Sequence, residues 1–179
     1  MARPGQATSE APSDGGIFAF IARHWLFGVN ALTAIYAALP LAAPALKAVG
    51  LHLPAQAIYF VYMNFFCHQI LSRHFYIGDY PIAYCQRDLA IYTSMFLGGL
   101  AFALVRDRLW PLPWTVYGIL ILPMAVDGFT QLFGWRESTW ALRVLTGTLF
   151  GLASVWLLYP RPTGVHRNRS LKQQVPPPL

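Results

Sequence analysis

Long apolar stretches alternate with short polar breaks along this chain, and five of the stretches approach the length of a membrane-spanning helix. A helix needs roughly 20 mostly apolar residues to cross the hydrocarbon core of a bilayer. The pattern therefore predicts an all-α, polytopic membrane helical bundle with about five transmembrane helices. The expected spans are residues 17–39 or 25–39, 54–71, 84–105, 113–133 and 138–159.

Prolines and charged residues mark the expected ends of these spans. Pro40 and Pro44 are expected to break the first helix, because proline lacks a backbone N–H and clashes with the preceding turn. The sequence Arg-Asp-Arg at 106–108 stops the third span, and Pro160 ends the last one. These limits divide the chain into a disordered leader at 1–16, a transmembrane helical domain at 17–160 and a basic, proline-ended cytoplasmic tail at 161–179.

The composition fits a membrane protein better than a soluble one. The chain is 56% hydrophobic and 11% charged, whereas soluble domains carry about 25% charged residues. Its mean hydropathy is +0.44. The net charge of +6 comes from scattered basic residues, so no nucleic-acid partner is expected. The expected partners are the lipid bilayer and other membrane protein subunits.

The distribution of basic residues suggests an orientation. Five crossings would place the two ends of the chain on opposite faces of the membrane. The tail carries Arg161, Arg167, Arg169 and Lys172 and no acidic residue, which suits a cytoplasmic face with anionic lipid. We therefore expect a multi-pass protein of the cell inner (plasma) membrane, with its N-terminus outside and its C-terminus cytoplasmic.

Polar and ionisable residues gather at one end of the expected helices. Antiparallel connection brings the end of the second helix, the start of the third, the end of the fourth and the start of the fifth to one membrane face. Such groups are costly in or near hydrocarbon, so each one suggests a functional role. This expected set, the polar cap, comprises Cys67, His68, Gln69, Arg73, Cys85, Arg87, Asp88, Asp127, Thr130, Gln131, Arg136, Glu137 and Arg143.

A stripe of residues on the fifth expected helix predicts a packed helix face and an ion pair. Arg143, Gly147 and Gly151 follow one another at four-residue steps and share one helix face. The GxxxG pattern allows two helix backbones to approach closely, so this face is predicted to lie inside the bundle. Arg143 is then predicted to form an ion pair with Asp127 or Glu137.

The two cysteines, Cys67 and Cys85, leave three interpretations open. They form a disulfide if the cap lies on an oxidising outer face, or they are structural thiols. In the third interpretation they bind zinc or another metal together with Asp88 and either His68 or His74. The chain has no CxxC spacing, so the metal signal is weak.

Two stretches resemble a family of predicted bacterial and archaeal integral membrane proteins of unknown function. The family pattern is C-H-Q, then S-R-S-F, then P-x-C-x-R-C-x-G-I-Y. The run at 67–92 of this chain resembles it and reads CHQILSRHFYIGDYPIAYCQRDLAIY. The matching residues in this run are Cys67, His68, Gln69, Ser72, Arg73, Phe75, Gly78, Pro81, Cys85, Arg87, Ile91 and Tyr92. The second stretch matches at Pro123, Asp127, Gly128, Thr130, Gln131, Arg136, Glu137, Ser138, Thr139, Leu142, Arg143, Thr146 and Gly147.

The resemblance covers about residues 55–158 and implies a shared membrane fold and a shared site, but no reaction. Within the C-x-R-C-x-G-I-Y part of the pattern, the chain departs from the family at two positions. Asp88 stands where the family has the second cysteine of C-x-R-C, and Ala90 replaces the glycine that follows. The departure weakens any role that needs three cysteines, although aspartate is itself a metal ligand.

Three functions are compatible with these observations. The small size and high apolarity favour a non-catalytic accessory subunit of a larger respiratory, photosynthetic or transport complex in the membrane. The first alternative is a membrane thiol or metal enzyme with the polar cap as its site. The second is a transporter or proton-path component that uses Asp127, because Pro123 interrupts the same helix. No Ser-His-Asp, HExxH or Gly-rich phosphate motif is present, so no reaction and no catalytic residue is assigned.

Overall fold

The computed structural model describes residues 15–65, 70–105 and 109–160, and these residues form five α-helices. Four of the helices are long and apolar enough to cross a membrane. The prediction of an all-α membrane bundle is therefore confirmed. Most of the predicted leader and all of the predicted tail lie outside the described residues. The helices are α1 (Gly15–Ala48), α2 (His52–Phe65), α3 (Gln86–Val105), α4 (Trp114–Leu132) and α5 (Trp140–Leu158).

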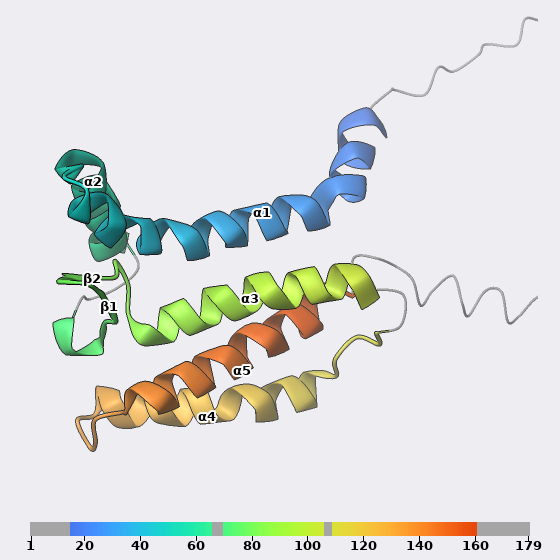
Figure 1. Ribbon diagram of the computed structural model, residues 1–179. Helices are drawn as coiled ribbons and strands as arrows, with labels where there is room; N and C mark the ends of the chain where they lie inside the picture. The colour runs from blue at the N-terminus through green and yellow to red at the C-terminus, as the bar shows by residue number, and fades with distance from the viewer. Residues whose placement is uncertain (1–14, 66–69, 106–108, 161–179) are drawn as a thin grey trace, which may run out of the picture.

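The four long helices lie side by side in the order α1, α3, α5, α4 (Figure 1). Helices α3 and α5 run in the same direction, and α1 and α4 run against them. The starts of α3 and α5 and the end of α4 meet at one end of the bundle, here named the cap end. At the opposite end, the far end, the Trp25 ring of α1 meets the Tyr159 ring edge-on, with 5.5 Å between centroids. The pair α3–α5 lies between α1 and α4 and is the centre of the bundle.

The second helix does not lie along the bundle. Within the described residues α2 has 14 residues, too few to cross a bilayer, and it lies at the cap end of α1 (Figure 1). A short 3-10 helix, η1 (Leu71–Arg73), and a two-stranded antiparallel hairpin, β1 (Tyr76–Ile77) and β2 (Tyr80–Pro81), precede α3. Gly78 makes the hairpin turn with a positive φ of 59°, which glycine adopts without steric cost.

The arrangement changes the expected topology. The start of α1 and the end of α5 both lie at the far end (Figure 1). The expectation of chain ends on opposite membrane faces required an odd number of crossings. The described residues supply four long helices, an even number, because α2 does not run along the bundle.

Helix α1 does not end at Pro40, as the sequence suggested, but continues through both Pro40 and Pro44. Each proline leaves the carbonyl four residues earlier without its helical donor. The Tyr62 hydroxyl donates to the Tyr36 carbonyl at 3.2 Å, and the N–H of Ala83 donates to the Pro40 carbonyl at 3.3 Å. Both carbonyls thus have a donor from another segment, which removes the main penalty for proline within a membrane helix.

Further tyrosine hydroxyls attach the neighbouring segments at the cap end. The Tyr84 hydroxyl donates to the Ala37 carbonyl of α1 at 3.1 Å, and the Tyr59 hydroxyl of α2 donates to the Pro81 carbonyl at 2.5 Å. Burial raises the pKa of Tyr84, so its hydroxyl keeps its proton and remains a donor. These bonds surround a buried apolar cluster that includes Ala43 and joins α1 and α2 to the segment before α3.

Helices α3 and α5 approach closely because α5 lacks side chains along the contact. A Cβ at Gly151 would lie 2.1 Å from Ser94 Oγ and 2.6 Å from the Ile91 carbonyl oxygen. A Cβ at Gly147 would lie 2.7 Å from the Arg87 carbonyl oxygen. These distances exclude any side chain at either glycine without a shift of α3, as the GxxxG pattern predicted.

Candidate functional site

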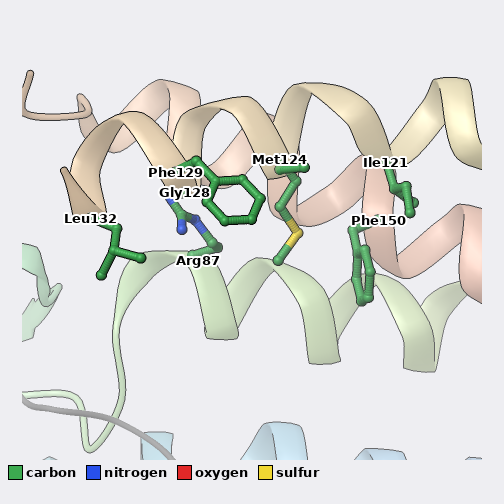
Figure 2. Close-up of a pocket in the computed structure, with 8 residues that line it drawn as sticks. Arg87, Ile121, Met124, Gly128, Phe129, Leu132 and Phe150 are labelled. Atoms are coloured by element: carbon green, nitrogen blue, oxygen red, sulfur yellow. The ribbon is translucent and has the colours of Figure 1, made fainter. Parts of the chain in front are cut away.

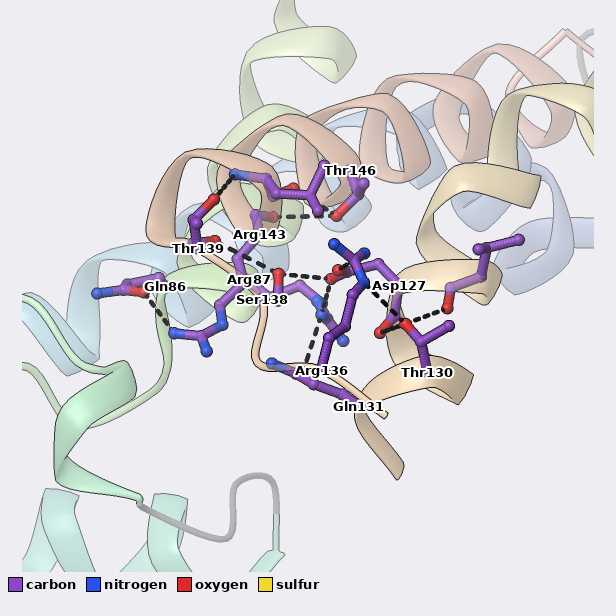
Figure 3. Close-up of polar contacts among 12 residues, drawn as sticks. Gln86, Arg87, Asp127, Thr130, Gln131, Arg136, Ser138, Thr139, Arg143 and Thr146 are labelled. Atoms are coloured by element: carbon purple, nitrogen blue, oxygen red, sulfur yellow. Dashed lines mark hydrogen bonds and ion pairs between the residues drawn. The ribbon is translucent and has the colours of Figure 1, made fainter. Parts of the chain in front are cut away.

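Asp127 is the centre of the polar contacts at the cap end. Its side chain, near the end of α4, is 1% exposed. Arg87 Nη2 from α3 binds Asp127 Oδ2, and Arg136 Nη2 donates to Oδ1 at 2.7 Å (Figure 3). The Ser138 hydroxyl donates to Oδ2 at 2.9 Å. One buried carboxylate therefore joins α3, α4 and the segment that enters α5.

A tight turn after α4 brings Arg136 and the following residues back to the cap. The Gly134 N–H donates to the Gln131 carbonyl at 3.2 Å, and the Trp135 N–H donates to the Thr130 carbonyl at 3.0 Å. Gly134 has a positive φ of 69°, the left-handed conformation that commonly ends a helix. Arg136 Nε then donates to Thr130 Oγ1 at 3.2 Å, which holds the guanidinium over the end of α4.

Arg143 is buried, and its partners are neutral amides. Its side chain lies one turn into α5, and the residue is 6% exposed. Arg143 Nη1 donates to Gln86 Oε1 at 3.1 Å. With the Gln131 amide oriented to suit its neighbours, its oxygen accepts from Arg143 Nη2 at 3.1 Å and from the Ser138 N–H at 3.0 Å.

The predicted ion pair between Arg143 and Asp127 or Glu137 is wrong. Both oxygens of Asp127 accept from other donors, chiefly Arg87 and Arg136. Glu137 is exposed and forms no ion pair with another described residue. Arg143 belongs to the glycine stripe of α5, which faces α3. Its guanidinium therefore contacts the Gln86 amide of α3 instead of a carboxylate. The cap therefore holds more positive than negative charge around Asp127.

Sequence reasoning missed Gln86 and Ser138, although a signal for Gln86 was present. Helix α3 carries Gln86, Ala90 and Ser94 at four-residue steps, the same spacing as the stripe of α5. Parallel helices in close contact place such stripes in register. The stripes pair Gln86 with Arg143, Ala90 with Gly147 and Ser94 with Gly151. Ser138 was treated as a helix start, and no sequence signal connected it with Asp127.

A second polar group lies at the start of α3. The Cys85 Sγ–H donates to Asp88 Oδ2 at 3.2 Å. His74 is buried, and its Nδ1 lies 2.7 Å from the Ile82 carbonyl oxygen, which can only accept, so Nδ1 is the donor of this hydrogen bond. His74 Nε2 is buried and has no hydrogen-bond partner among the described residues. The Gln86 amide donates to the His74 carbonyl at 3.3 Å and connects this group with Arg143.

Part of the predicted polar cap lies outside the described residues. Cys67, His68 and Gln69 are in this category, so the disulfide between Cys67 and Cys85 and the four-ligand metal set stay predictions. Within the described ranges no group of three His, Cys, Asp or Glu residues is arranged to hold a metal ion. Arg73 is half-buried in η1 and lies within electrostatic range of Arg143.

Comparisons with known proteins match the part of the chain that builds this site. Residues 67–157 match the family described as predicted membrane protein (DUF2085). An uncharacterized protein of Methanocaldococcus jannaschii is 38% identical over 106 residues, which cover 58% of this chain and 67% of that protein. An uncharacterized protein of Methanothermobacter thermautotrophicus is 32% identical over 89 residues, which cover 50% of this chain and 80% of that protein.

No solved structure matches the chain. The matched range contains α3, α4, all of α5 except its last residue, and Asp127 with all of its described partners. The expected resemblance to a membrane-protein family of unknown function is thereby confirmed at the level of the family. The chain belongs to the DUF2085 family of predicted membrane proteins.

Proposed function

We propose that this protein is a non-catalytic accessory subunit of a larger membrane complex and that a groove over α3 receives a transmembrane helix of a partner subunit. The groove has a volume of about 510 Å³ and lies between α1 and α5. Its floor includes Ala90 and Ser94 of α3, and its walls include Leu41 of α1 and Val144 of α5. Small residues on such a floor allow a second helix backbone to approach closely.

Two hydroxyl groups in this groove carry the proposal. Thr93 of α3 and Thr148 of α5 both line the groove, and neither hydroxyl hydrogen-bonds to any residue in the described part of the chain. A hydroxyl in hydrocarbon gains about 1 kcal/mol from an interhelical partner. Lipid tails offer no such partner, whereas a helix with small polar residues does. The proposed occupant is therefore a helix of that composition.

The contacts of Asp127 support a structural rather than a catalytic role for the cap. Arg87 of α3 and two residues of the segment between α4 and α5, Arg136 and Ser138, occupy both of its oxygens. Such a buried network fixes the relative positions of helices, as a subunit that presents a rigid docking surface requires. The same occupancy weighs against Asp127 as the exchangeable group of a proton path.

The proposal includes an orientation with the cap end outside and the far end in the cytoplasm of a plasma-membrane protein. Four crossings place both ends of the described chain at one membrane face. By position in the sequence, the far end then holds Arg3, Arg23, Arg106, Arg108, Arg161, Arg167, Arg169 and Lys172. The cap end holds Lys47, Arg73, Arg87, Arg136 and Arg143. Positive residues are enriched on the cytoplasmic side. Reporter fusions at the two chain ends test this orientation, and opposite locations for the two reporters would contradict it.

Native purification tests the subunit proposal. The full chain is purified from its own membranes in mild detergent, and the groove variant Thr93→Leu/Thr148→Leu is compared with the unchanged protein. We expect a stoichiometric partner with the unchanged protein and about tenfold less of it with the groove variant, the equivalent of about 1.4 kcal/mol. Mass spectrometry identifies the partner, and a photo-crosslinker at Leu97, on the rim of the groove, is expected to label one of its membrane-spanning helices.

The matched control is Thr115→Leu, which makes the same change at an exposed position of α4. It is expected to retain the partner at the level of the unchanged protein. The proposal fails if the unchanged protein migrates alone, or if the groove variant and Thr115→Leu retain the partner equally.

The second candidate, a membrane thiol or metal protein, is favoured by the group at the start of α3. Cys85 donates to Asp88, and a buried neighbouring ring nitrogen, His74 Nε2, has no described partner. Zinc analysis of the purified protein tests this candidate. Bound zinc that is lost in Cys85→Ser and retained in Ser72→Ala would support it, and zinc-free protein would exclude a resident zinc site.

A further inference from the structure

A second groove lies between α3, α4 and α5 and runs along the membrane-embedded part of α4 (Figure 2). Its volume is about 290 Å³. The lining is apolar except for one arginine, Arg87. The apolar side chains are Ile121, Met124, Phe129, Leu132 and Phe150. A charged group in the wall of an otherwise apolar groove within a membrane protein requires a partner.

Arg87 has a donor left for such a partner. Its Nη2 binds Asp127, whereas its Nη1 forms no hydrogen bond with any described residue. Nη1 lies beside Gly128, where an added Cβ would be 3.7 Å away. The absence of a side chain at Gly128 keeps the approach to Nη1 open, and the Arg87 side chain is 17% exposed.

The charge around the groove favours an anion. Arg87 and Arg136 share one carboxylate, that of Asp127. Arg143 lies within electrostatic range of Arg87 and hydrogen-bonds to neutral amides. Asp88 is the other carboxyl group within electrostatic range of Arg87. The three guanidinium groups still outnumber these two carboxyl groups, and in a medium of low dielectric constant the excess attracts an anionic group. The planar donors of a guanidinium suit carboxylate and phosphate oxygens, and phosphate is the anionic group that membrane lipids supply.

The dimensions of the groove fit most of one lipid chain. Arg87 and Gly128 lie toward the cap end, and Ile121 and Phe150 lie further along the helices (Figure 2). The rise along α4 from Gly128, beside Arg87 Nη1, to Ile121 is roughly 10 Å at 1.5 Å per residue. An acyl chain spans half of the hydrocarbon core, about 15 Å. The groove therefore follows most of the length of one chain, with the arginine at its headgroup end.

We propose that this groove is a binding site for an anionic phospholipid of the surrounding bilayer. The phosphate lies at Arg87 Nη1, and one acyl chain follows α4 toward Phe150. The site is separate from the docking groove over α3 and does not depend on the proposed partner subunit.

Lipid titration of delipidated protein in detergent tests the site. Thermal unfolding of the full chain is followed as phosphatidylglycerol, phosphatidylcholine or inorganic phosphate is added. We expect a saturable rise in Tm with phosphatidylglycerol at concentrations at least tenfold below those at which phosphatidylcholine acts, and no rise with inorganic phosphate. Equal responses to the two lipids would overturn the proposal, and so would a response to inorganic phosphate equal to that of phosphatidylglycerol.

Substitution of a glycine assigns the response to this groove. Gly128→Leu fills the space beside Arg87 and leaves the ion pair with Asp127 in place. Its matched control is Gly118→Leu on the same helix, where no atom lies within 4 Å of an added Cβ. We expect Gly128→Leu to lose the preference for phosphatidylglycerol and Gly118→Leu to keep it. If Gly128→Leu does not fold, Ala125→Leu makes the equivalent block within the lining, and retention of the preference in the folded blocked variant would overturn the proposal.

Discussion

The two parts of this bundle are held together by different kinds of contact. In the unit of α3, α4 and α5, glycines of α5 lie against the backbone of α3, and Asp127 joins two arginines. In the unit of α1 and α2, tyrosine hydroxyls and one backbone N–H occupy carbonyls, two of which are freed by Pro40 and Pro44. The family match at residues 67–157 covers the first unit and begins after α2.

The difference shows how a membrane helix is attached when there is no hydrophobic force between helices. Close glycine packing and a buried ion network make the first unit intolerant of small changes in shape or charge. The second unit relies on single neutral hydrogen bonds, each of which contributes about 1 kcal/mol. Substitutions in the first unit are therefore expected to have larger effects than substitutions in the second.

The largest effect is expected from Asp127→Asn. This change keeps the volume of the side chain but leaves Arg87 and Arg136 without a carboxylate. Removal of one member of a buried ion network typically lowers the free energy of unfolding by about 3–5 kcal/mol, which denaturant titration in detergent micelles measures. The control is Arg136→Gln, because the Arg136 side chain is 45% exposed and an exposed pair contributes about 1 kcal/mol or less. Equal losses for the two variants would contradict the central position of Asp127.

A smaller loss is expected from Gly151→Ala. The new Cβ would lie 2.6 Å from the Ile91 carbonyl oxygen, so α3 and α5 must move apart, at a cost of about 1–3 kcal/mol. Gly118→Ala makes the same change on an open face of α4 and is expected to be neutral or stabilising by up to about 1 kcal/mol, because alanine favours helix. Unfolding in the same micelles measures both. A Gly151→Ala protein as stable as Gly118→Ala would show that the α3–α5 contact is looser than described.

The smallest effect is expected from Tyr62→Phe. Loss of the hydroxyl leaves the Tyr36 carbonyl without this donor, and the cost is about 1 kcal/mol. Hydrogen exchange is expected to rise in α1 around Pro40 and to stay unchanged in α3 and α5. The matched change in the other unit is Tyr117→Phe, whose hydroxyl contacts Ser154 at 3.3 Å, and its effect is expected in α4 and α5. Increased exchange throughout the bundle in Tyr62→Phe would remove the distinction between the two units.

The limits of α3, α4 and α5 can be predicted from sequence to within two residues, because turns and charged residues separate them clearly. The continuation of α1 cannot be predicted in this way. Its prolines are tolerated through Tyr62 and Ala83, which come from distant positions in the sequence, and local pattern says nothing about such donors. For the same reason α2 was interpreted as a span, since its apolar composition gives no indication that it lies at the end of α1.

For the candidate site, helix order predicts which charged residues lie at one end of the bundle but not which of them pair. Several arginines lie near Asp127 in the expected arrangement. The turn after α4 holds Arg136 over the end of α4, whereas the face of α5 that meets α3 carries Arg143 to Gln86. The register of α3 against α5 settles the contact of Arg143, and it depends on small residues at matched steps on both helices. Comparison of the two stripes, rather than the α5 stripe alone, would have indicated the contact between Gln86 and Arg143.

The proline carbonyls of α1 also have a consequence for the order of biosynthesis. A nascent chain emerges N-terminus first, so α1 is made before residues 62 and 83, whose donors complete it. Until those donors arrive, the two carbonyls lack the hydrogen bonds from Tyr62 and Ala83, and an unsatisfied carbonyl in hydrocarbon costs several kcal/mol. Helix α1 is therefore translated before α3, but its backbone hydrogen bonds are completed only when the segment before α3 is present. Its insertion is coupled to the arrival of the segment that leads into α3.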